Sequence, residues 1–425
     1  MAITIEDQPY AWSARGQKLM IVASSDETAQ NGFQYGLTIT NVTTSKTYNF
    51  YISPAADGRL YFDLQSLIQL RNLEQLNLHN HTSSVINETT CRNLIQFSIQ
   101  EWWIVDGELT EAEGSAVSGE DILVVNQYYQ VSDGYKPNPE TGASNVKFSF
   151  TNTSSLSMSD RVPDAQYPKW FSTWNIPAGH ISIPVRNADY GLIYFPGNDT
   201  YLSNNAIADV NILIVSGIGI GLNQSIALNE VVSAVPCFPA NLTTWPGFTP
   251  SATLMTPDWR YIRIIPRNAG GIEIGKRFYL WNEDYYGNKE CHWPNIRLAW
   301  VGARGSYEYW NFKKKSEYTD EIDRKVYRRN LFNGTPTIFN KYDRGKYQRQ
   351  NLVDRVLTVT SDYINAQTFE YLRGLLVSNQ VHLLNDDGTH QAVNIDDTTY
   401  TEKRDADGKL YNVTLKVRIA NEYWT

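Results

Sequence analysis

Apolar and polar residues alternate over several short stretches of this chain. In Ile95-Gln-Phe-Ser-Ile99 every second residue is apolar, and the stretch from Val413 to Ile419 alternates in the same way. Tyr307-Glu-Tyr-Trp-Asn-Phe312 follows a Gly-marked turn and mixes rings with polar residues. A period of two places successive side chains on opposite faces of a strand. The pattern therefore predicts half-buried β-strands, one of which carries rings.

The first region extends to residue 131 and combines short strands with one helical segment. Asp63 precedes Leu64-Gln-Ser-Leu-Ile-Gln-Leu70, and its carboxylate can cap a short helix by accepting from the first free N–H groups. A turn at Gly58 leads into the strand before this helix. Strands are predicted at 19–23, 33–42, 48–53, 60–62, 95–99 and 122–125. Many short strands joined by turns favour a β-sandwich.

Two segments rich in turn-forming residues divide the chain. One extends from Ser132 to Ser144, and the Pro-rich one from Pro236 to Pro257 is unsuited to a helix or a central strand. A chain of 425 residues is also too long for one ordinary core. We therefore predict an N-terminal β-sandwich with one short helix at 1–131, a middle β domain at 146–235, and a C-terminal β-rich domain with one helix at 258–425. The expected class is mainly β, with several antiparallel β-sandwich or barrel modules and a few short helices.

Glycines follow an apolar stretch in the middle region. Strands are predicted at 181–185, 192–195 and 212–220, and Gly217-Ile-Gly-Ile-Gly221 lies at the end of the last one. A dinucleotide-binding loop requires G-x-G-x-x-G and an acidic residue after a second strand, and the spacing here is wrong. Glycines two residues apart let a strand bend or approach another backbone closely. We favour that interpretation.

The C-terminal region mixes strands with one amphipathic helix. Asn365 precedes a helical pattern that places Phe369, Leu372 and Leu376 on one face. Strands are predicted at 261–265, 296–300, 307–312, 381–384, 392–395 and 410–419. These elements predict an antiparallel sheet with one helix packed against it.

Rings are abundant and charges are few, at 13% and 19% of the residues. This balance favours β packing, because rings and β-branched side chains fit a pleated sheet.

The net charge of −8 argues against nucleic-acid binding by the whole chain. The segment from Lys313 to Arg355, however, contains twelve Lys and Arg residues and only six Asp and Glu residues. This basic segment is interpreted as a solvated β-ribbon or a docking surface for an acidic neighbour, with contact to DNA as a third alternative.

The chain contains no G-x-S-x-G, H-E-x-x-H or phosphate-loop motif. His79-Asn-His81 places two imidazoles on one side of an extended chain, but no further metal ligand follows, and an exposed polar loop explains it better. A glycosidase requires only two facing carboxylates. Nothing in the sequence pairs the available ones, which are Asp189, Asp199, Glu283, Asp284, Asp396 and Asp397. We predict no catalytic residue, no metal ligand and no cofactor.

Cysteine usage and the N-terminal residues bear on the compartment. Cys91, Cys237 and Cys291 are far apart and odd in number, which favours free thiols over a disulfide framework. The first residues show no basic and apolar regions of a secretion signal, and no apolar run approaches the length of a membrane span. We expect synthesis in a cytoplasm and no membrane partner.

Three segments of the chain resemble virion proteins of tailed phages that infect Bacteroidetes-type bacteria, in the tail, collar or baseplate region. The segments are 33–68, 297–312 and 368–381, with the β-segments after the last. The second resembles the W-x-N-x-x-G-x-x-x-x-F-x-F strand pair of those proteins, with Gly302 where the pattern has Asn. The resemblance covers about half of the chain. It implies a role in assembly and attachment and supplies no functional residues.

We therefore expect a non-enzymatic virion protein made in the bacterial host cytoplasm, a tail, baseplate or fibre-connecting subunit that forms a ring or trimer. Its partners would be copies of itself and other virion proteins. The alternatives are a receptor-binding protein or depolymerase for host surface glycans and a head-associated decoration protein. Core packing of the rings and ordinary solvation of the basic residues compete with an interface role. The expected contact residues are Arg328, Arg329, Lys341, Arg344, Arg349, Tyr307, Tyr309 and Trp310.

Overall fold

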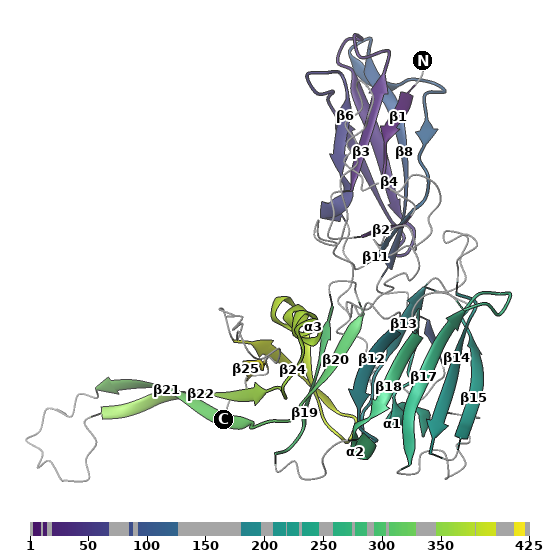
Figure 1. The fold of residues 1–425 in the computed structure, drawn as a ribbon. Helices are drawn as coiled ribbons and strands as arrows, with labels where there is room; N and C mark the ends of the chain where they lie inside the picture. The colour runs from purple at the N-terminus through teal and green to yellow at the C-terminus, as the bar shows by residue number, and fades with distance from the viewer. Residues whose placement is uncertain are drawn as a thin grey trace, which may run out of the picture. The chain divides into compact units, whose positions relative to one another are not determined.

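A computed structural model gives the architecture of the chain (Figure 1). It describes residues 3–9, 12–14, 19–67, 85–87, 92–125, 180–196, 207–217, 219–228, 232–245, 258–273, 277–286, 293–302, 306–328, 346–378, 380–396 and 412–420. The chain divides into two compact units. The first comprises Met1–Gly287 with Val301–Glu308, and the second comprises Asn288–Trp300 with Tyr309–Thr425. The described residues are mainly β with a few short helices, which confirms the predicted class.

The N-terminal region forms two facing sheets. One has the strand order β1 (Ile3–Asp7), β3 (Met20–Ser25), β6 (Leu60–Asp63). The other has the order β2 (Trp12–Ala14), β11 (Ile122–Val125), β8 (Arg92–Val105), β4 (Gln34–Asn41), β5 (Lys46–Ile52), with β9 (Glu108–Glu111) and β10 (Val117–Ser118) also paired to β8. All of these pairs are antiparallel except β2 with β11. This arrangement is the predicted β-sandwich.

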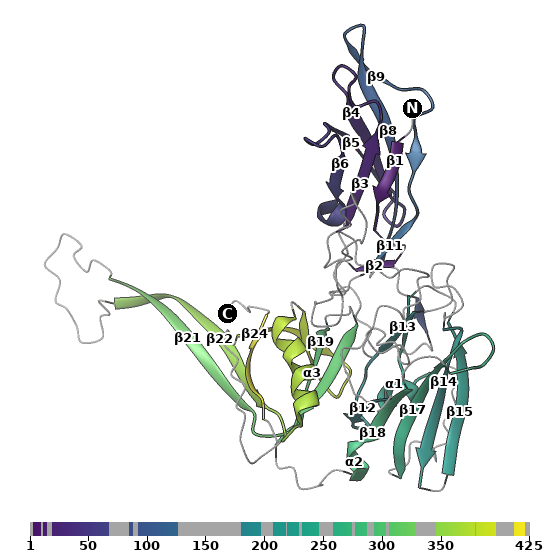
Figure 2. The ribbon, with the colours of Figure 1, turned by 45° about the horizontal axis from the view of Figure 1, so that its top comes forward.

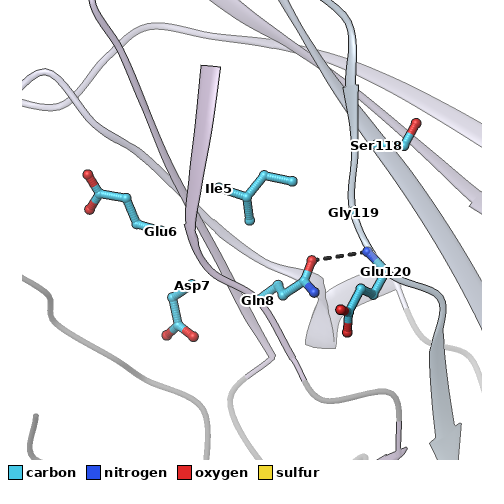
Figure 3. Close-up of a pocket in the computed structure, with 7 residues that line it drawn as sticks. All are labelled: Ile5, Glu6, Asp7, Gln8, Ser118, Gly119 and Glu120. Atoms are coloured by element: carbon cyan, nitrogen blue, oxygen red, sulfur yellow. Dashed lines mark hydrogen bonds between the residues drawn. The ribbon is translucent and has the colours of Figure 1, made fainter. Parts of the chain in front are cut away.

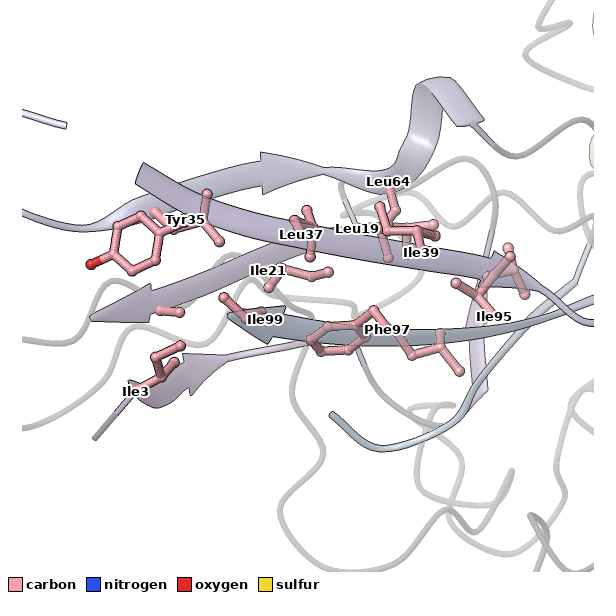
Figure 4. Close-up of a cluster of buried hydrophobic side chains, with 14 of the residues drawn as sticks. Ile3, Leu19, Ile21, Tyr35, Leu37, Ile39, Leu64, Ile95, Phe97 and Ile99 are labelled. Carbon is pink, nitrogen blue, oxygen red and sulfur yellow. The ribbon is translucent and has the colours of Figure 1, made fainter. Parts of the chain in front are cut away.

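Apolar side chains from alternate strand positions fill the space between the two sheets (Figure 4). Tyr35 is fully buried there, and its hydroxyl donates to the carbonyl of Gly58 at 2.7 Å. Gly58 has a φ of +82°, a conformation that glycine adopts without steric cost, so the predicted turn is present. The other members of the cluster include Ile3, Leu19, Ile21, Leu37, Ile39, Leu60, Leu64, Ile95, Phe97, Ile99, Ile122 and Val124.

The predicted helix after Asp63 begins as a 3₁₀ turn at Leu64–Leu67, and its continuation to residue 70 lies outside the described residues. The carboxylate of Asp63 accepts from the backbone N–H of Gln65 at 3.0 Å and of Leu19 at 3.2 Å. Asp63 therefore caps the turn as predicted and also ties it to the start of β3, the neighbouring strand of the same sheet.

The middle region is a second two-layered β structure. One sheet has the order β12 (His180–Val185), β18 (Arg277–Asn282), β17 (Trp259–Arg267), β14 (Asp209–Ser216), β15 (Gly219–Ala227). The other has the order β13 (Ile193–Pro196), β16 (Val232–Val235), β7 (Ile86–Asn87). The rings of Phe195 and Phe278 meet with centroids 5.6 Å apart, so the two sheets pack face to face. The pairing of β12 with β18 is parallel.

Strand pairing differs from the predicted domain boundaries in two places. β17 and β18, which we assigned to the third region, pair with β14 and β12 of the middle sheet. β7, from the first region, pairs with β16. The described part of the Pro-rich segment, residues 236–245, is buried, because Cys237, Phe238 and Leu242 have no exposed surface. It also contains a short helix, α1 (Pro239–Leu242), in a segment where we predicted none.

The glycines of the middle region form a hairpin turn. We predicted one strand over 212–220, whereas β14 ends at Ser216 and β15 starts at Gly219. Gly219 has a φ of +136°, which a residue with a side chain rarely adopts. The glycine spacing therefore reverses the chain instead of bending a continuous strand.

The C-terminal sheet has seven strands and one helix. Their order is β20 (Tyr307–Phe312), β19 (Ile296–Val301), β23 (Val381–Leu384), β24 (His390–Ile395), β25 (Thr414–Ile419), β22 (Lys346–Thr360), β21 (Glu317–Arg328). The helix α3 (Ala366–Val377) begins at the predicted cap, since the side chain of Asn365 accepts from the N–H of Thr368 at 2.8 Å. Another short helix, α2 (Glu283–Tyr286), follows β18. Among the described residues, α3 is the helix of the unit that holds this sheet, whereas α2 belongs to the first compact unit.

Candidate assembly interface

β21 and the first part of β22 leave the C-terminal sheet as a two-stranded ribbon (Figures 1 and 2). We call the segment formed by Glu317–Arg328 and Lys346–Arg355 the ribbon. β25 pairs only with Val356–Thr360 of β22, so within the described residues Asp320–Arg328 and Lys346–Arg355 pair only with each other. Every residue of β21 is exposed. A two-stranded hairpin without further packing is only marginally stable in water.

Large apolar side chains lie on this exposed ribbon. Tyr318, Ile322 and Val326 keep 56%, 49% and 55% of their surfaces accessible. Their spacing of four residues places all three on one face, where Ile322 is opposite the exposed Val353. We call this row the apolar stripe. The opposite face carries a stacked ring pair, Tyr327 with Tyr347. Exposed apolar groups gathered in one place mark interaction surfaces in soluble proteins.

Ion pairs hold the base of the ribbon to the sheet. The guanidinium of Arg418, on β25, contacts Asp354 at 2.5 Å, Asp396 at 2.9 Å and Glu321 at 3.0 Å. Its hydrogen bond lowers the pKa of the Asp396 carboxyl below the usual value. Asp320 is similarly paired with Arg355 across the two strands at 2.9 Å, and this bond lowers the pKa of Asp320. The base is therefore anchored and largely neutralised.

Charge is segregated along β21. The half nearest the sheet carries all of the acidic side chains of the strand, which are Glu317, Asp320, Glu321 and Asp323. The outer half carries its basic side chains, which are Arg324, Lys325 and Arg328. The described part of the chain provides no ion pair for these three cations, whereas three of the four acids are paired. The ribbon is thus acidic at its base and basic farther out.

The predicted basic contact residues belong to this ribbon in part. Arg328 lies at the outer end of β21 and is exposed, and Arg349 is a residue of β22. Arg329, Lys341 and Arg344 lie outside the described residues. The described part of the basic segment therefore forms the predicted β-ribbon, and its role as a docking surface stays a prediction.

The predicted contact rings are placed in the interior. Tyr307, Tyr309 and Trp310 are buried, as are all six residues of β20. The hydroxyl of Tyr371, on α3, accepts from the N–H of Tyr309 at 3.1 Å and donates to its carbonyl at 3.2 Å. The alternative of core packing therefore applies to these rings, because the helix covers the strand that carries them.

Gly302 precedes this strand at the position where the resembling proteins have Asn. A Cβ atom on Gly302 would lie 2.9 Å from Cγ of Glu308, closer than real Cβ contacts allow. The backbone N–H of Gly302 also donates to the carbonyl of Ser306 at 2.8 Å. A side chain at this position would require the buried side chain of Glu308 to move.

A pocket of about 330 Å³ lies at the end of β1 and beside β10 (Figure 3). Glu6, Asp7 and Glu120 line it, together with Gln8, whose side-chain oxygen accepts from the N–H of Glu120 at 3.2 Å. Glu6 is paired with Arg59 at 2.9 Å. Among the described residues, no group of three or more His, Cys, Asp or Glu side chains is arranged to hold a metal ion.

The carboxylates considered for glycoside cleavage have local structural partners where they are described. Asp189 is buried and accepts from both the backbone and the guanidinium of Arg186. Asp284 accepts from the N–H of Asn187 at 2.9 Å, and Asp396 is paired with Arg418. Asp199 and Asp397 lie outside the described residues, as do His79 and His81.

Three rings that sequence reasoning did not single out lie together on the middle sheet. Tyr261 is opposite Trp281 across β17 and β18, and Tyr279 is two residues before Trp281 on the same strand. Their centroids are 4.9 to 6.1 Å apart, and Tyr279 and Trp281 are nearly parallel. All three are half-buried on the face opposite the buried Ile262 and Leu280. The alternation of Tyr261-Ile-Arg and Tyr279-Leu-Trp was the signal that could have located this cluster.

Comparisons with known proteins give no family for this chain. No model of a protein family matches, and no curated protein matches. One similar solved structure is a crystal structure of a tetra-tandem repeat in the extending region of a large adhesion protein, with 9% identity and a TM-score of 0.22 over 97% of this chain and 73% of that one. At that TM-score the likeness carries no argument. No helix in the described part of the chain is long and apolar enough to cross a membrane.

Proposed function

We propose that this chain is a non-enzymatic structural subunit of a tailed-phage particle, from the tail or baseplate or connecting a fibre, and that the ribbon is the arm by which it binds neighbouring subunits. The observation that carries the proposal is the apolar stripe on a ribbon whose outer strand is exposed along its whole length. The assignment to a phage particle, rather than to another assembly, is based on the sequence resemblance to phage virion proteins.

Nothing in the described part of the chain covers the outer strand of the ribbon. Apolar surface removed from water contributes about 25 cal/mol per Å², so a partner that covers Tyr318, Ile322 and Val326 gains stability from each of them. The same contact would order a hairpin that is marginal alone. Such coverage by a neighbouring subunit is the ordinary use of an unpartnered apolar row on an otherwise charged surface.

The test replaces the apolar stripe without touching the fold. The double variant Ile322→Lys, Val326→Lys should lose incorporation into particles, because it puts charge where the neighbour would bury apolar surface. Its stability should stay within about 0.5 kcal/mol of the parent protein, since both residues are exposed. Incorporation is measured by co-sedimentation of the tagged subunit with particles from infected cells, and stability by urea unfolding.

A matched control is Thr319→Glu, which adds charge to the same strand at an exposed position on the opposite face. This variant should be incorporated at the parent level. Parent-level incorporation of the stripe variant, with the fold intact, would remove the ribbon from the proposal.

A second function, binding of a host surface glycan, is favoured by the ring cluster of Tyr261, Tyr279 and Trp281. Rings side by side on an outer sheet face offer stacking surface to sugar rings. Tyr279→Ala combined with Trp281→Ala should reduce binding on a glycan array about tenfold or more if these rings stack on sugar. A reducing-end assay on the same glycans separates binding from cleavage. If the parent protein binds no glycan on the array, this alternative function is wrong.

A further inference from the structure

The outer edge of β21 has no strand beside it in the described part of the chain, because the strand order of the C-terminal sheet ends there. All twelve residues of β21 are exposed. The extra residue at the ribbon bulge falls on β22, between the partners of Lys325 and Val326, so β21 itself alternates without interruption. An exposed edge strand of this length is a template for pairing with another strand.

Symmetry restricts how β21 can pair with its own copy. Two antiparallel copies related by a two-fold axis perpendicular to the sheet place one residue opposite itself. Residues equally far before and after that one then face each other. Like charges directly opposite each other destabilise a strand pair. A residue on the axis must therefore be uncharged.

The sequence of β21 leaves one such residue at its centre. Between Asp320 and Lys325 every residue is charged except Ile322. With Ile322 on the axis, the apolar side chain meets its own copy. Asp320 of one copy then lies opposite Arg324 of the other, and Tyr318 lies opposite Val326. On this face Tyr318 lies opposite Val326, Asp320 opposite Arg324 and Ile322 opposite its own copy. The same pairs follow in reverse order on the other side of the axis.

We propose that two copies of this chain associate by antiparallel pairing of their β21 strands about Ile322, which joins two ribbons into a four-stranded sheet. This inference rests on the proposed assembly function and names the partner. The acidic base of each ribbon is brought against the basic outer half of the other, and the apolar side chains of the two stripes lie opposite each other with an Asp320–Arg324 pair between successive apolar pairs. The segregation of charge along β21 thus becomes complementary when the strand is turned around.

The other face of the pair contains one kind of unfavourable contact, which the two-fold axis repeats: Glu321 of each copy falls opposite Asp323 of the other. Arg418 lies against this same face and contacts Glu321 at 3.0 Å, which offsets the repulsion. Lys325 falls opposite Thr319, and Tyr327 falls opposite Glu317, so no further like charges meet there.

Single cysteines test both the pairing and its register in the full chain. In the proposed register, Cα atoms of directly opposite residues lie about 4.5–5.5 Å apart, within reach of a disulfide, whereas diagonal neighbours lie about 7–8 Å apart. Mild oxidation of Ile322→Cys should therefore give about tenfold more disulfide-linked dimer than oxidation of Glu321→Cys or Asp323→Cys alone. Mixing those last two variants should give a linked heterodimer, because residues 321 and 323 are opposite each other.

The parent protein, oxidised in parallel, sets the background from Cys91, Cys237 and Cys291. Absence of dimer above this background for all the variants would overturn the pairing, and preferential linkage of Asp323→Cys or Glu321→Cys to itself would overturn the register. The stripe variant separates this inference from the proposed function. If it abolishes incorporation into particles while Ile322→Cys gives no dimer, the ribbon is an assembly arm whose partner is a different protein.

Discussion

Replacement of Trp300 by alanine should lower the free energy of unfolding of the C-terminal sheet by about 3–5 kcal/mol. Trp300 lies on β19 and is 0% exposed, and its ring meets that of Tyr371 on α3 with centroids 5.2 Å apart. The helix comes close to the indole at Gly374, where an added Cβ would lie 3.4 Å from its Nε1. Truncation would leave a cavity between helix and sheet that neither element can close by a small shift.

Urea unfolding followed by circular dichroism measures this loss, and hydrogen exchange of the α3 amides locates it. The indole Nε1 makes no hydrogen bond with the described residues, so the loss is one of packing. Trp293→Ala is the matched control, because Trp293 is 46% exposed and should change stability by less than about 0.5 kcal/mol. Equal losses from the two variants would show that α3 does not depend on the Trp300 ring.

Acidification should destabilise the same sheet through His382. Burial lowers the pKa of His382 to about 4, with a further contribution from His390, whose ring centroid is 5.3 Å away. The pKa of His390 is lowered by burial as well. An unfolded chain protonates residue 382 near pH 6.5, whereas the folded chain protonates His382 only near pH 4. The folded state is therefore fully favoured above pH 6.5 and loses stability as the pH falls toward 4.

The size of this loss follows from the shift of the pKa. Each pKa unit corresponds to about 1.4 kcal/mol. Protonation of His382 alone therefore lowers the free energy of unfolding by about 3 kcal/mol when the pH has fallen to 4. Urea unfolding at pH 7.5, 6, 5 and 4.5 should show this slope, and His382→Gln should reduce it. Asp320 and Asp396 have pKa values below the usual one, so their protonation falls mainly below this range. Identical slopes for parent and variant would contradict a titrating His382.

Alternation and capping located most of the strands and the helix from sequence, because they are local. β4, β8, β19 and β20 follow period-two segments, and α3 starts where Asn365 offers its side chain. Pairing partners are not local. β17 reaches β14 across the Pro-rich segment, and β12 reaches β18 nearly a hundred residues later in the chain. No periodicity within one strand encodes such a partner, so the boundary at residue 258 was wrong.

The same distinction applies to the interface. The charge count identified the ribbon, because a surplus of Lys and Arg is a property of the segment itself. The rings of β20 were placed on the surface because alternation does not say which face of a strand will be covered, and α3 comes from another part of the chain. The apolar stripe was missed because charged residues separate Tyr318, Ile322 and Val326 in the sequence. Their spacing of four residues was the available signal.

The two-residue strand β7 has a consequence for synthesis on the ribosome. Its partner residue Ser233 follows Asn87 by 146 residues, so β7 leaves the exit tunnel long before β16 exists. The edge it completes therefore closes late, after most of the polypeptide of the first compact unit has been translated. Chaperones that shelter nascent strands would have their longest contact with this chain around Ile86, and a ribosome pause before residue 232 would prolong it.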